Sequence, residues 1–528
     1  MRKADQVSLT APLAVPAFRS LWSANIVSNV GTMMQGVGAA WLMTSLTEST
    51  LLVGLVQTAA TLPVFLVGLL AGALADLADR KKLLFWSQAW MMSMATILGL
   101  LTLADWTSPV VLLGLTFAIG LGGAMSIPAW QATVQDLVPK PLVPSAVSLN
   151  SISFNAARAV GPALGGLLVA AAGAGFAFLA NAASFFAVLL AVKTWKPETP
   201  IAPRPSEDIL GAIRSGFRYL LHAPRLQAPI IRAVTFNLCA AAVWTLLPLL
   251  ARDVLHTTAS GYGVLLGTFG AGSILAGVFL PHLRSRFALE GIIALGTILA
   301  ALSLFGLSFS HAPWHAGVCL FLAGIAWVGV LVNFNVAVQT SVPAWVRGRA
   351  LAFYLLAFQG ALALNGILWG WLAGVIGISQ CFTLASLGLV AGLAFIRFFP
   401  LNSSEGVDLT PSPPWPEIHD SFDADPQDGP ILVTREFLVA PENVDNFRLL
   451  MRQMRERRLR DGARRWRLYR DAQNPQRFLE IFRLDSWGEH LLQHDRTTME
   501  DQEIESKVLA YHQGSDRPLT THYFGAEE

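Results

Sequence analysis

Charged residues of opposite sign share one short turn of this sequence. Asp76, Arg80 and Lys81 stand between two long apolar runs, and a second carboxylate, Asp136, ends a later apolar run. A carboxylate and a guanidinium attract each other more strongly away from bulk water. We therefore expect Asp76, Arg80 and Asp136 to form an acid-base-acid cluster at the ends of these apolar runs. Gly72 is expected to permit close helix contact. The alternative is a static surface salt bridge, worth about 0–1 kcal/mol.

A second stretch combines a charge with small residues. It comprises Arg158, Gly161, Pro162, Gly165 and Gly166. Glycines four apart let a neighbouring helix approach closely, and a proline inside a helix permits a bend; ordinary small-residue packing is the alternative interpretation. Because it stands within an apolar run, Arg158 would attract an anion or organise a neighbouring helix, unless its side chain snorkels to the end of the run.

The composition indicates that lipid surrounds most of the chain. Hydrophobic residues make up 53% and charged residues 14%, and the apolar ones are concentrated in the first 400 positions. About twelve segments reach the ~20-residue length of a membrane helix. The expected spans are residues 18–42, 52–75, 83–104, 109–131, 146–171, 174–193, 230–251, 261–282, 289–309, 315–339, 350–374 and 377–398.

The loop charges predict the orientation. Lys and Arg residues gather in alternate loops, and the loops on the other side carry only Arg252. Because positive charge is retained on the cytoplasmic side, both termini are expected in the cytoplasm.

An internal repeat predicts two related halves. The run 131–139 reappears as 335–343, matching at Val, Gln, Val and Pro, and Gly166 meets Gly370 at the same offset. Two six-helix bundles derived from one unit are therefore expected.

Polar side chains within the apolar helices are the predicted lining of a substrate cavity. Each of them could instead form a hydrogen bond between helices. They are Asn25, Asn29, Gln35, Gln57, Gln131, Asn155, Asn237, Asn333, Asn335, Gln359 and Asn365.

The chain changes character beyond residue 400. Residues 401–429 are rich in Pro and acids and indicate a flexible linker. Strand patterns at 431–439, 463–469, 477–484 and 521–524, with helical patterns at 442–459 and 488–512, give the β-α-β-β-α-β order of a ferredoxin-like domain.

His490 and His494 lack companion metal ligands, so no metal or cofactor is expected. An arginine-rich run over 452–467 could meet anionic lipid or RNA or be solvated, and lipid is the more natural choice beside a membrane.

Several of these motifs resemble those of major facilitator superfamily transporters. Gly72-x-x-x-Asp76-x-x-x-Arg80-Lys81 is similar to the signature between helices 2 and 3, although Leu77 and Asp79 replace a basic residue and a Gly of that pattern. Gly161-Pro162-x-x-Gly165-Gly166 resembles the helix-5 motif of exporters and antiporters. The whole chain resembles the enterobactin-exporter-like group, and its tail looks like the dimeric α+β barrels of the antibiotic-biosynthesis-monooxygenase type.

The resemblance implies a fold and a domain division. The fold is an all-α polytopic membrane protein of twelve helices in two bundles, with a cytoplasmic α+β domain after them. The expected division is 1–192 and 230–400 for the bundles, 193–229 for a loop with an amphipathic helix, 401–429 for the linker and 430–528 for the ferredoxin-like domain.

The resemblance also implies a function. It is export of a small amphipathic molecule, such as a siderophore or drug, across the bacterial inner membrane by alternating access with proton antiport. The resemblance implies that the cluster of Asp76, Arg80 and Asp136 is a latch that closes the inner face in the outward-open state, and that Arg158 attracts an anionic or catechol-like substrate. The expected partners are the substrate, the bilayer and H⁺, without nucleic acid, and the tail is expected to be regulatory or dimerising. The alternative is a membrane-tethered enzyme whose tail acts on the compound that the bundle handles.

Overall fold

The computed structural model describes residues 8–195, 209–401, 408–412 and 424–525. These residues form two compact units, which we describe separately. The membrane unit contains residues 8–195, 230–334 and 354–398. The tail unit contains the described residues of 209–229, 335–353 and 399–525.

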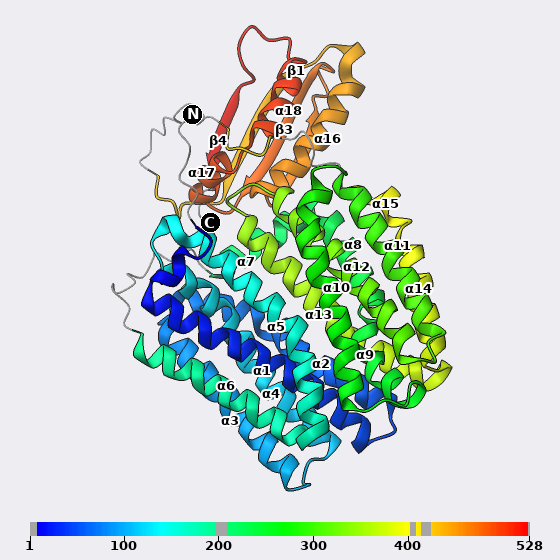
Figure 1. The fold of residues 1–528 in the computed structure, drawn as a ribbon. Coiled ribbons are helices and arrows are strands. Elements are labelled where there is room, and N and C mark those ends of the chain that lie inside the picture. The colour runs from blue at the N-terminus through cyan, green and yellow to red at the C-terminus, as the bar shows by residue number, and fades with distance from the viewer. Residues whose placement is uncertain (1–7, 196–208, 402–407, 413–423, 526–528) are drawn as a thin grey trace. The chain divides into compact units, whose positions relative to one another are not determined.

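Long helices build the membrane unit (Figure 1). The N-terminal half contains α1 (Pro16–Leu46), α2 (Thr50–Leu77), α3 (Arg80–Leu103), α4 (Pro109–Asp136), α5 (Val143–Ala172) and α6 (Ala174–Thr194). The C-terminal half contains α8 (Pro224–Ala240), α9 (Ala242–Leu249), α10 (Ala259–Arg284), α11 (Leu289–Ser308), α12 (Pro313–Thr340), α13 (Arg347–Ile376), α14 (Ile378–Gly392) and α15 (Phe395–Phe398). The start of α8, the end of α12 and the start of α13 belong to the tail unit.

The number of apolar helices differs by one from the expected twelve. Among the described residues, eleven helical segments are long and apolar enough to cross a membrane. Helix α1 is not one of them, although it has 31 residues. Arg, Ser, Asn and Gln side chains interrupt its apolar sequence and lower its mean hydropathy.

The seventh expected span, residues 230–251, is not one continuous helix. Helix α8 begins earlier, at Pro224, and α9 is followed by a π-helical turn, Leu250–Val254. Pro248 lies within α9 and has no N–H to donate to the carbonyl four residues earlier. The regular hydrogen-bond pattern is therefore interrupted just before the π-helical turn.

The two halves share the register of the sequence repeat. Gly173 separates α5 from α6 and has φ of +92°, while Gly377 separates α13 from α14 and has φ of +90°. These glycines stand at the same offset as Gly166 and Gly370. An L side chain rarely adopts this backbone conformation, so the repeat preserves the residue that each turn requires.

The tail unit contains a four-stranded antiparallel sheet covered by helices (Figure 1). Its strands are β1 (Ile431–Leu438), β2 (Arg465–Arg470), β3 (Arg477–Leu484) and β4 (Thr520–Phe524), in the order β2-β3-β1-β4. Helices α7 (Ile209–His222), α16 (Val444–Asp461), α17 (Trp487–Asp495) and α18 (Met499–Leu509) complete it. Phe437, Phe447, Met451 and Phe478 pack between the sheet and α16. The strands lie where the alternating sequence pattern predicted them.

The predicted helix over 488–512 is wrong in one respect, because it is two helices. Thr498 separates α17 from α18 and forms a capping box with Asp501: each side chain accepts a hydrogen bond from the other residue's backbone N–H. This arrangement satisfies backbone donors that a continuous helix would use internally, and it starts a new helix.

Candidate functional site

The turn between α2 and α3 is held to other helices of the N-terminal half. Arg80 Nη1 lies 2.5 Å from Asp136 Oδ2 at the end of α4, and the two side chains are 18% and 33% exposed. Lys81 Nζ donates to the carbonyl oxygens of Lys193 and Trp195 at the end of α6. The turn is therefore joined to two helices of its own half. We call this end of the membrane unit the basic end.

Other residues of this turn differ from the sequence expectation. The side chain of Asp76 lies outside the described residues. Asp79 accepts hydrogen bonds from the backbone N–H groups of Lys81 and Lys82 and caps α3. A Cβ atom on Gly72 would meet no described atom within 4 Å. The described residues therefore form no close helix contact at Gly72, and the contact expected there stays a prediction.

The glycines of α5 are in contact with two different helices. A Cβ on Gly161 would lie 2.6 Å from Met33 Cβ, and one on Gly165 would lie 2.7 Å from Met34 Cα, so α1 packs against this face. A Cβ on Gly166 would lie 2.7 Å from the Cα of Gly263 in α10. Small residues here permit backbone contact both within the N-terminal half and between the halves.

A second contact between backbones of the two halves joins α2 to α13. Gly54 packs against the carbonyl oxygen of Gly366, and Thr50 Oγ1 donates to the carbonyl oxygen of Gly370 at 2.8 Å. Like the contact of Gly166, this one lies near the end of the helices opposite to the basic end. The repeat relates Gly166 to Gly370, so equivalent positions of the two halves make both contacts.

Arg158 lies between the halves, near the middle of α5. Its Cζ is 5.8 Å from the centre of the Phe154 ring and 5.8 Å from that of Trp244 in α9. Trp244 in turn packs edge-on against Phe269 and Trp327. Among the described side chains, no carboxylate pairs with Arg158. Its positive charge is therefore stabilised by aromatic rings and remains available to an anion.

Four residues predicted to line the cavity are instead buried in contacts between helices. They are Gln35, Asn237, Asn333 and Asn365. Asn237 Nδ2 donates to the carbonyl oxygen of Phe358 at 3.0 Å, and Asn365 Nδ2 donates to the carbonyl oxygen of Asn237 at 3.0 Å. These amides join α8 to α13, so the expectation that they face a cavity is wrong.

The other two buried amides also join helices. Gln35 accepts a hydrogen bond from Asn181, which links α1 to α6. Asn333 Oδ1 accepts from Arg284 Nε at 2.8 Å, which links α12 to α10. Most buried polar groups form hydrogen bonds, and each of these four amides forms at least one with a neighbouring helix. One sequence alone could not decide between this alternative and a cavity.

The remaining predicted lining residues keep partial or full exposure. They are Asn25, Asn29, Gln57, Gln131, Asn155, Asn335 and Gln359. Asn25 donates to Asn150 Oδ1 at 3.2 Å, and the same oxygen accepts from Trp130 Nε1 at 3.1 Å. Asn335 belongs to the tail unit and accepts from Gln339. Asn150 and Asn181 were absent from the predicted set, although both are polar residues within apolar segments.

An ion pair inside the C-terminal half was also missed. Arg232 Nη1 in α8 lies 2.6 Å from Glu290 Oε1 at the start of α11, and the side chains are 5% and 15% exposed. Glu290 stands at the boundary of its expected span, so its sequence position did not reveal a partner on α8. Buried pairs of this kind persist when their geometry offsets the cost of desolvation.

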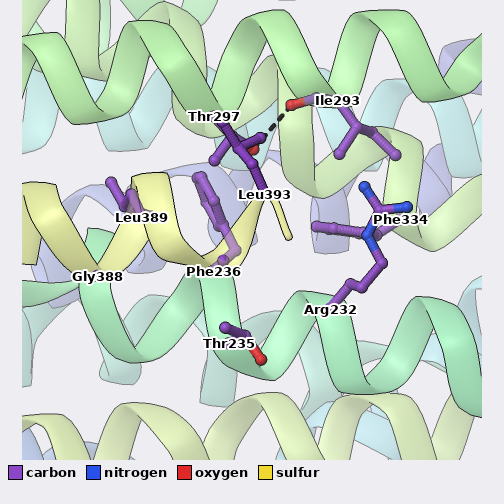
Figure 2. A pocket seen from close by; sticks show the side chains of 10 residues that line it. Arg232, Thr235, Phe236, Ile293, Thr297, Phe334, Gly388, Leu389 and Leu393 are labelled. Atoms are coloured by element: carbon purple, nitrogen blue, oxygen red, sulfur yellow. Dashed lines mark hydrogen bonds between the residues drawn. The ribbon is translucent and has the colours of Figure 1, made fainter. Parts of the chain in front are cut away.

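Arg232 also borders a small hollow in the C-terminal half. Figure 2 shows its guanidinium beside Phe334, with Thr235, Phe236 and Thr297 nearby. The hollow has a volume of about 20 Å³, which is room for one water molecule. It is therefore too small for a substrate.

The amphipathic helix predicted before α8 is present as α7, and it packs against the tail sheet domain. Basic side chains of α7 and the start of α8 pair with acidic ones of the domain. The pairs are Arg218–Glu489 at 3.4 Å, His222–Glu456 at 3.2 Å and Arg225–Glu500 at 2.5 Å. The amphipathic helix therefore packs on the sheet domain through paired charges.

Aromatic residues extend this contact to the segment between α12 and α13. The Tyr219 ring of α7 packs edge-on against Trp345, with 5.6 Å between ring centres. Arg460 Cζ lies 5.5 Å from the centre of the Tyr219 ring, and Arg496 Cζ lies 4.9 Å from that of Trp345. Burial raises the pKa of the Tyr219 hydroxyl. The sheet domain therefore binds two separate segments of the chain that precede it.

Three histidines of the tail lie together. The Nε2 atoms of His490 and His494 are 3.2 Å apart, and the ring centres of His490 and His522 are 4.7 Å apart. Burial lowers the pKa of His490 to about 3 and that of His494 to about 4, so both rings are neutral at pH 7. Among the described residues, no cluster has the geometry to hold a metal ion.

Comparison with known proteins agrees with this architecture. The sequence profile of the family described as transmembrane secretion effector matches residues 7–528. The chain is 26% identical over 372 residues to the staphyloferrin A transporter of Staphylococcus aureus, covering 70% of this chain and 92% of that protein. It is 26% identical over 381 residues to the enterobactin exporter EntS of Salmonella typhimurium, covering 71% and 90%.

Solved transporter structures share the fold. A bacterial homolog of the human lysosomal transporter Spinster, in an inward-facing and occupied conformation, has a TM-score of 0.60 at 15% identity and covers 73% of this chain and 97% of that one. The nucleoside transporter NupG has a TM-score of 0.59 at 15% identity, covering 72% and 100%. Since the family profile also spans nearly the whole sequence, the chain belongs to the transmembrane secretion effector family of major facilitator transporters.

Proposed function

We propose that this chain exports a siderophore-like small molecule that carries negative charge. Its relatives include a transporter of staphyloferrin A and an exporter of enterobactin. The observation that carries the proposal to this chain is Arg158, a cation between the halves beside Trp244. A catecholate or carboxylate substrate would supply the negative charge that no described side chain supplies, and its ring could stack on the tryptophan.

We further propose twelve membrane crossings, with α1 as the least apolar, both termini in the cytoplasm and the chain in a bacterial inner membrane. The length of α1 supports the twelfth crossing. The basic residues Arg80, Lys81 and Lys82 at the α2–α3 turn support a cytoplasmic basic end, because positive charge is retained on that side.

The arrangement of contacts supports alternating access with the cytoplasmic side open. Backbone contacts between the halves at Gly54 and Gly166 lie toward the opposite end, and the contact of Gly270 with Ala159 lies beside Arg158, near the middle of α5. On the basic side of Arg158, α5 exposes Ser151, Ile152 and Asn155. Export then requires the halves to separate at these glycine contacts and to meet at the basic end, where Asp76 would complete the latch with the Arg80–Asp136 pair that is already formed.

We propose the domain division expected from sequence, with bundles over 1–192 and 230–400, a loop over 193–229, a linker over 401–429 and a cytoplasmic domain over 430–528. The strand order β2-β3-β1-β4 supports a ferredoxin-like fold for that domain. A regulatory or dimerising tail is favoured over a tethered enzyme, since the family and its relatives are transporters.

Replacing Arg158 tests the substrate proposal. Arg158→Ala should reduce export of a catecholate siderophore about 10- to 100-fold, because a hydrogen bond to a charged group is worth roughly 1.5–3 kcal/mol. Arg158→Lys should keep part of the activity. The measurement is export from cells that make the siderophore, with an uncharged fluorescent amphiphile as a second substrate. Arg286→Ala, at an exposed arginine of the basic end, is the matched control. Unchanged siderophore export by Arg158→Ala would contradict the proposal.

Exchanging the charges of Arg80 and Asp136 distinguishes a latch from a static salt bridge. Arg80→Asp and Asp136→Arg should each abolish export, and the double exchange should not restore it, because a latch also requires a basic residue at position 80 opposite Asp76. Lys82→Gln, at an exposed lysine of the same turn, should export normally. Recovery of export in the double exchange would show that the pair is only structural.

Glu290 is our candidate for the proton-coupling carboxylate. Protonation would weaken its pair with Arg232 and leave a buried cation without full compensation, which favours a different conformation. Wild-type export should collapse when a protonophore is added, whereas export by Glu290→Gln should be slow and equal with and without it. Glu48→Gln, at an exposed residue of the α1–α2 loop, is the control. A Glu290→Gln variant with wild-type protonophore sensitivity would assign coupling elsewhere.

We propose that the open face of the tail sheet pairs two copies of the chain. On the β1–β4 side, Leu432 is 37%, Tyr523 52% and Leu519 65% exposed. Leu519→Asp combined with Tyr523→Asp should convert a dimer into a monomer, measured by light scattering of the purified chain in detergent. Leu449→Asp, on the exposed surface of α16, should not. A monomeric wild type would refute the pairing.

A further inference from the structure

Most arginines of the tail domain have carboxylate partners. Arg435 pairs with Glu505 at 2.7 Å, and Arg460 with Asp461 and Asp501 at 2.7 Å. The arginine-rich run that could have met lipid is therefore partly internal: Arg457, Arg458 and Arg460 make ion pairs within the domain. Arginines without such partners stand out against this background.

Three arginines on the open face of β2 and β3 lack a carboxylate partner among the described residues. Arg465 of β2 lies directly opposite Arg483 of β3, and Arg467 follows on the same face of β2, opposite Ile481. Like charges directly opposite each other on a sheet destabilise it. A bound counter-charge would relieve this repulsion, and no described carboxylate of the domain forms an ion pair with these arginines.

These arginines border a hollow at the free edge of β2. Its volume is about 830 Å³, within the range of sites for small molecules. The lining residues are His222, Leu432, Arg455, Leu459, Arg464, Arg465, Trp466, Arg467, Tyr469, Ile481, Phe482 and Arg483. Five arginines and no carboxylate line it, and Tyr469 presents a ring that is 53% exposed.

We propose that this hollow binds a small molecule with two or more carboxylate or phosphate groups. Arg465, Arg467 and Arg483 would hold the anionic groups, because the guanidinium fork matches carboxylate and phosphate geometry. Arg464 is already engaged with Asp485, and Tyr469 offers a surface for an apolar or aromatic part of the ligand. This binding does not depend on the proposed transport function.

The hollow is also connected to the helix before the second half. His222, the last residue of α7, lines it and contacts Glu456 of α16 at 3.2 Å. A ligand bound among these arginines would therefore lie beside the attachment of α7 to the domain. Occupancy of the hollow would change the electrostatic surroundings of that attachment.

Calorimetric titration of the full chain tests the proposal. The chain is placed in nanodiscs of phosphatidylcholine, and citrate and pyrophosphate are the probes, with acetate as the monovalent comparison. We expect saturable binding of at least one of the two probes, weaker by at least tenfold in Arg465→Gln/Arg467→Gln/Arg483→Gln and unchanged in Arg448→Gln/Arg452→Gln. The control pair is exposed on α16 and does not line the hollow.

A single substitution gives a readout that does not depend on the triple variant folding. Without ligand, Arg483→Gln should raise the melting temperature of the tail, because it relieves repulsion with Arg465, and it should remove the stabilisation that the polyanion gives the wild type. The proposal is overturned if neither probe saturates, if acetate binds equally well, or if the triple variant binds as the wild type does. Arginine-dependent binding only to nanodiscs containing phosphatidylglycerol would assign the site to lipid instead.

Discussion

Direct contact between helix backbones is the interaction on which the membrane unit depends. In a bilayer, lipid chains are as apolar as the helices, so association relies on close packing and on hydrogen bonds between helices. Gly54 and Gly166 provide such packing between the halves, and Thr50 adds a hydrogen bond to a carbonyl oxygen of α13. Side chains at these glycines would separate the helices. The same smallness allows two backbones to part without disentangling side chains, as a transporter that changes conformation requires.

Ion pairs have the corresponding role in the tail unit. The domain holds α7 and the segment around Trp345 through salt bridges and through arginines stacked on aromatic rings. Because these groups are partly desolvated, their attraction is stronger than that of fully exposed pairs. Within the domain, the arginines of α16 share carboxylates in a network: Arg457 and Arg460 both contact Asp501 of α18, which specifies how α16 and α18 fit together. The exposed arginines on β2 and β3 lie outside this network.

Structure could be predicted from the sequence where a local requirement of the backbone selects one type of residue. Glycines four apart in α5, a repeat that brings Gly166 into register with Gly370, and alternating strands in the tail all follow from local requirements of the backbone. The direction in which a polar side chain points does not follow from such local requirements. Asn237 and Asn155 look alike in sequence, yet one bonds to α13 and the other is exposed, because tertiary neighbours decide.

Charges separated widely in sequence were equally difficult to predict. Arg232 and Glu290 pair across two helices, and the arginine run of α16 divides into buried and exposed members according to which side of the helix meets the sheet. Gly72 belongs to the motif before Asp76, but no described atom lies within 4 Å of the position that its Cβ would take. The packing of helices determines which of these charges meet. The periodicity of one segment does not describe that packing.

The attachment of the tail has a consequence for how the protein is made. Tyr219 and Trp345 are synthesised well before the strands that follow them, and their arginine partners, Arg460 and Arg496, come last. Until the domain folds, both aromatic rings lack the partners that cover them. Completion of the domain therefore also completes the contacts of α7 and of the segment between α12 and α13. A chain that ends before Arg460 would keep its membrane helices but would leave Tyr219 and Trp345 without their arginine partners.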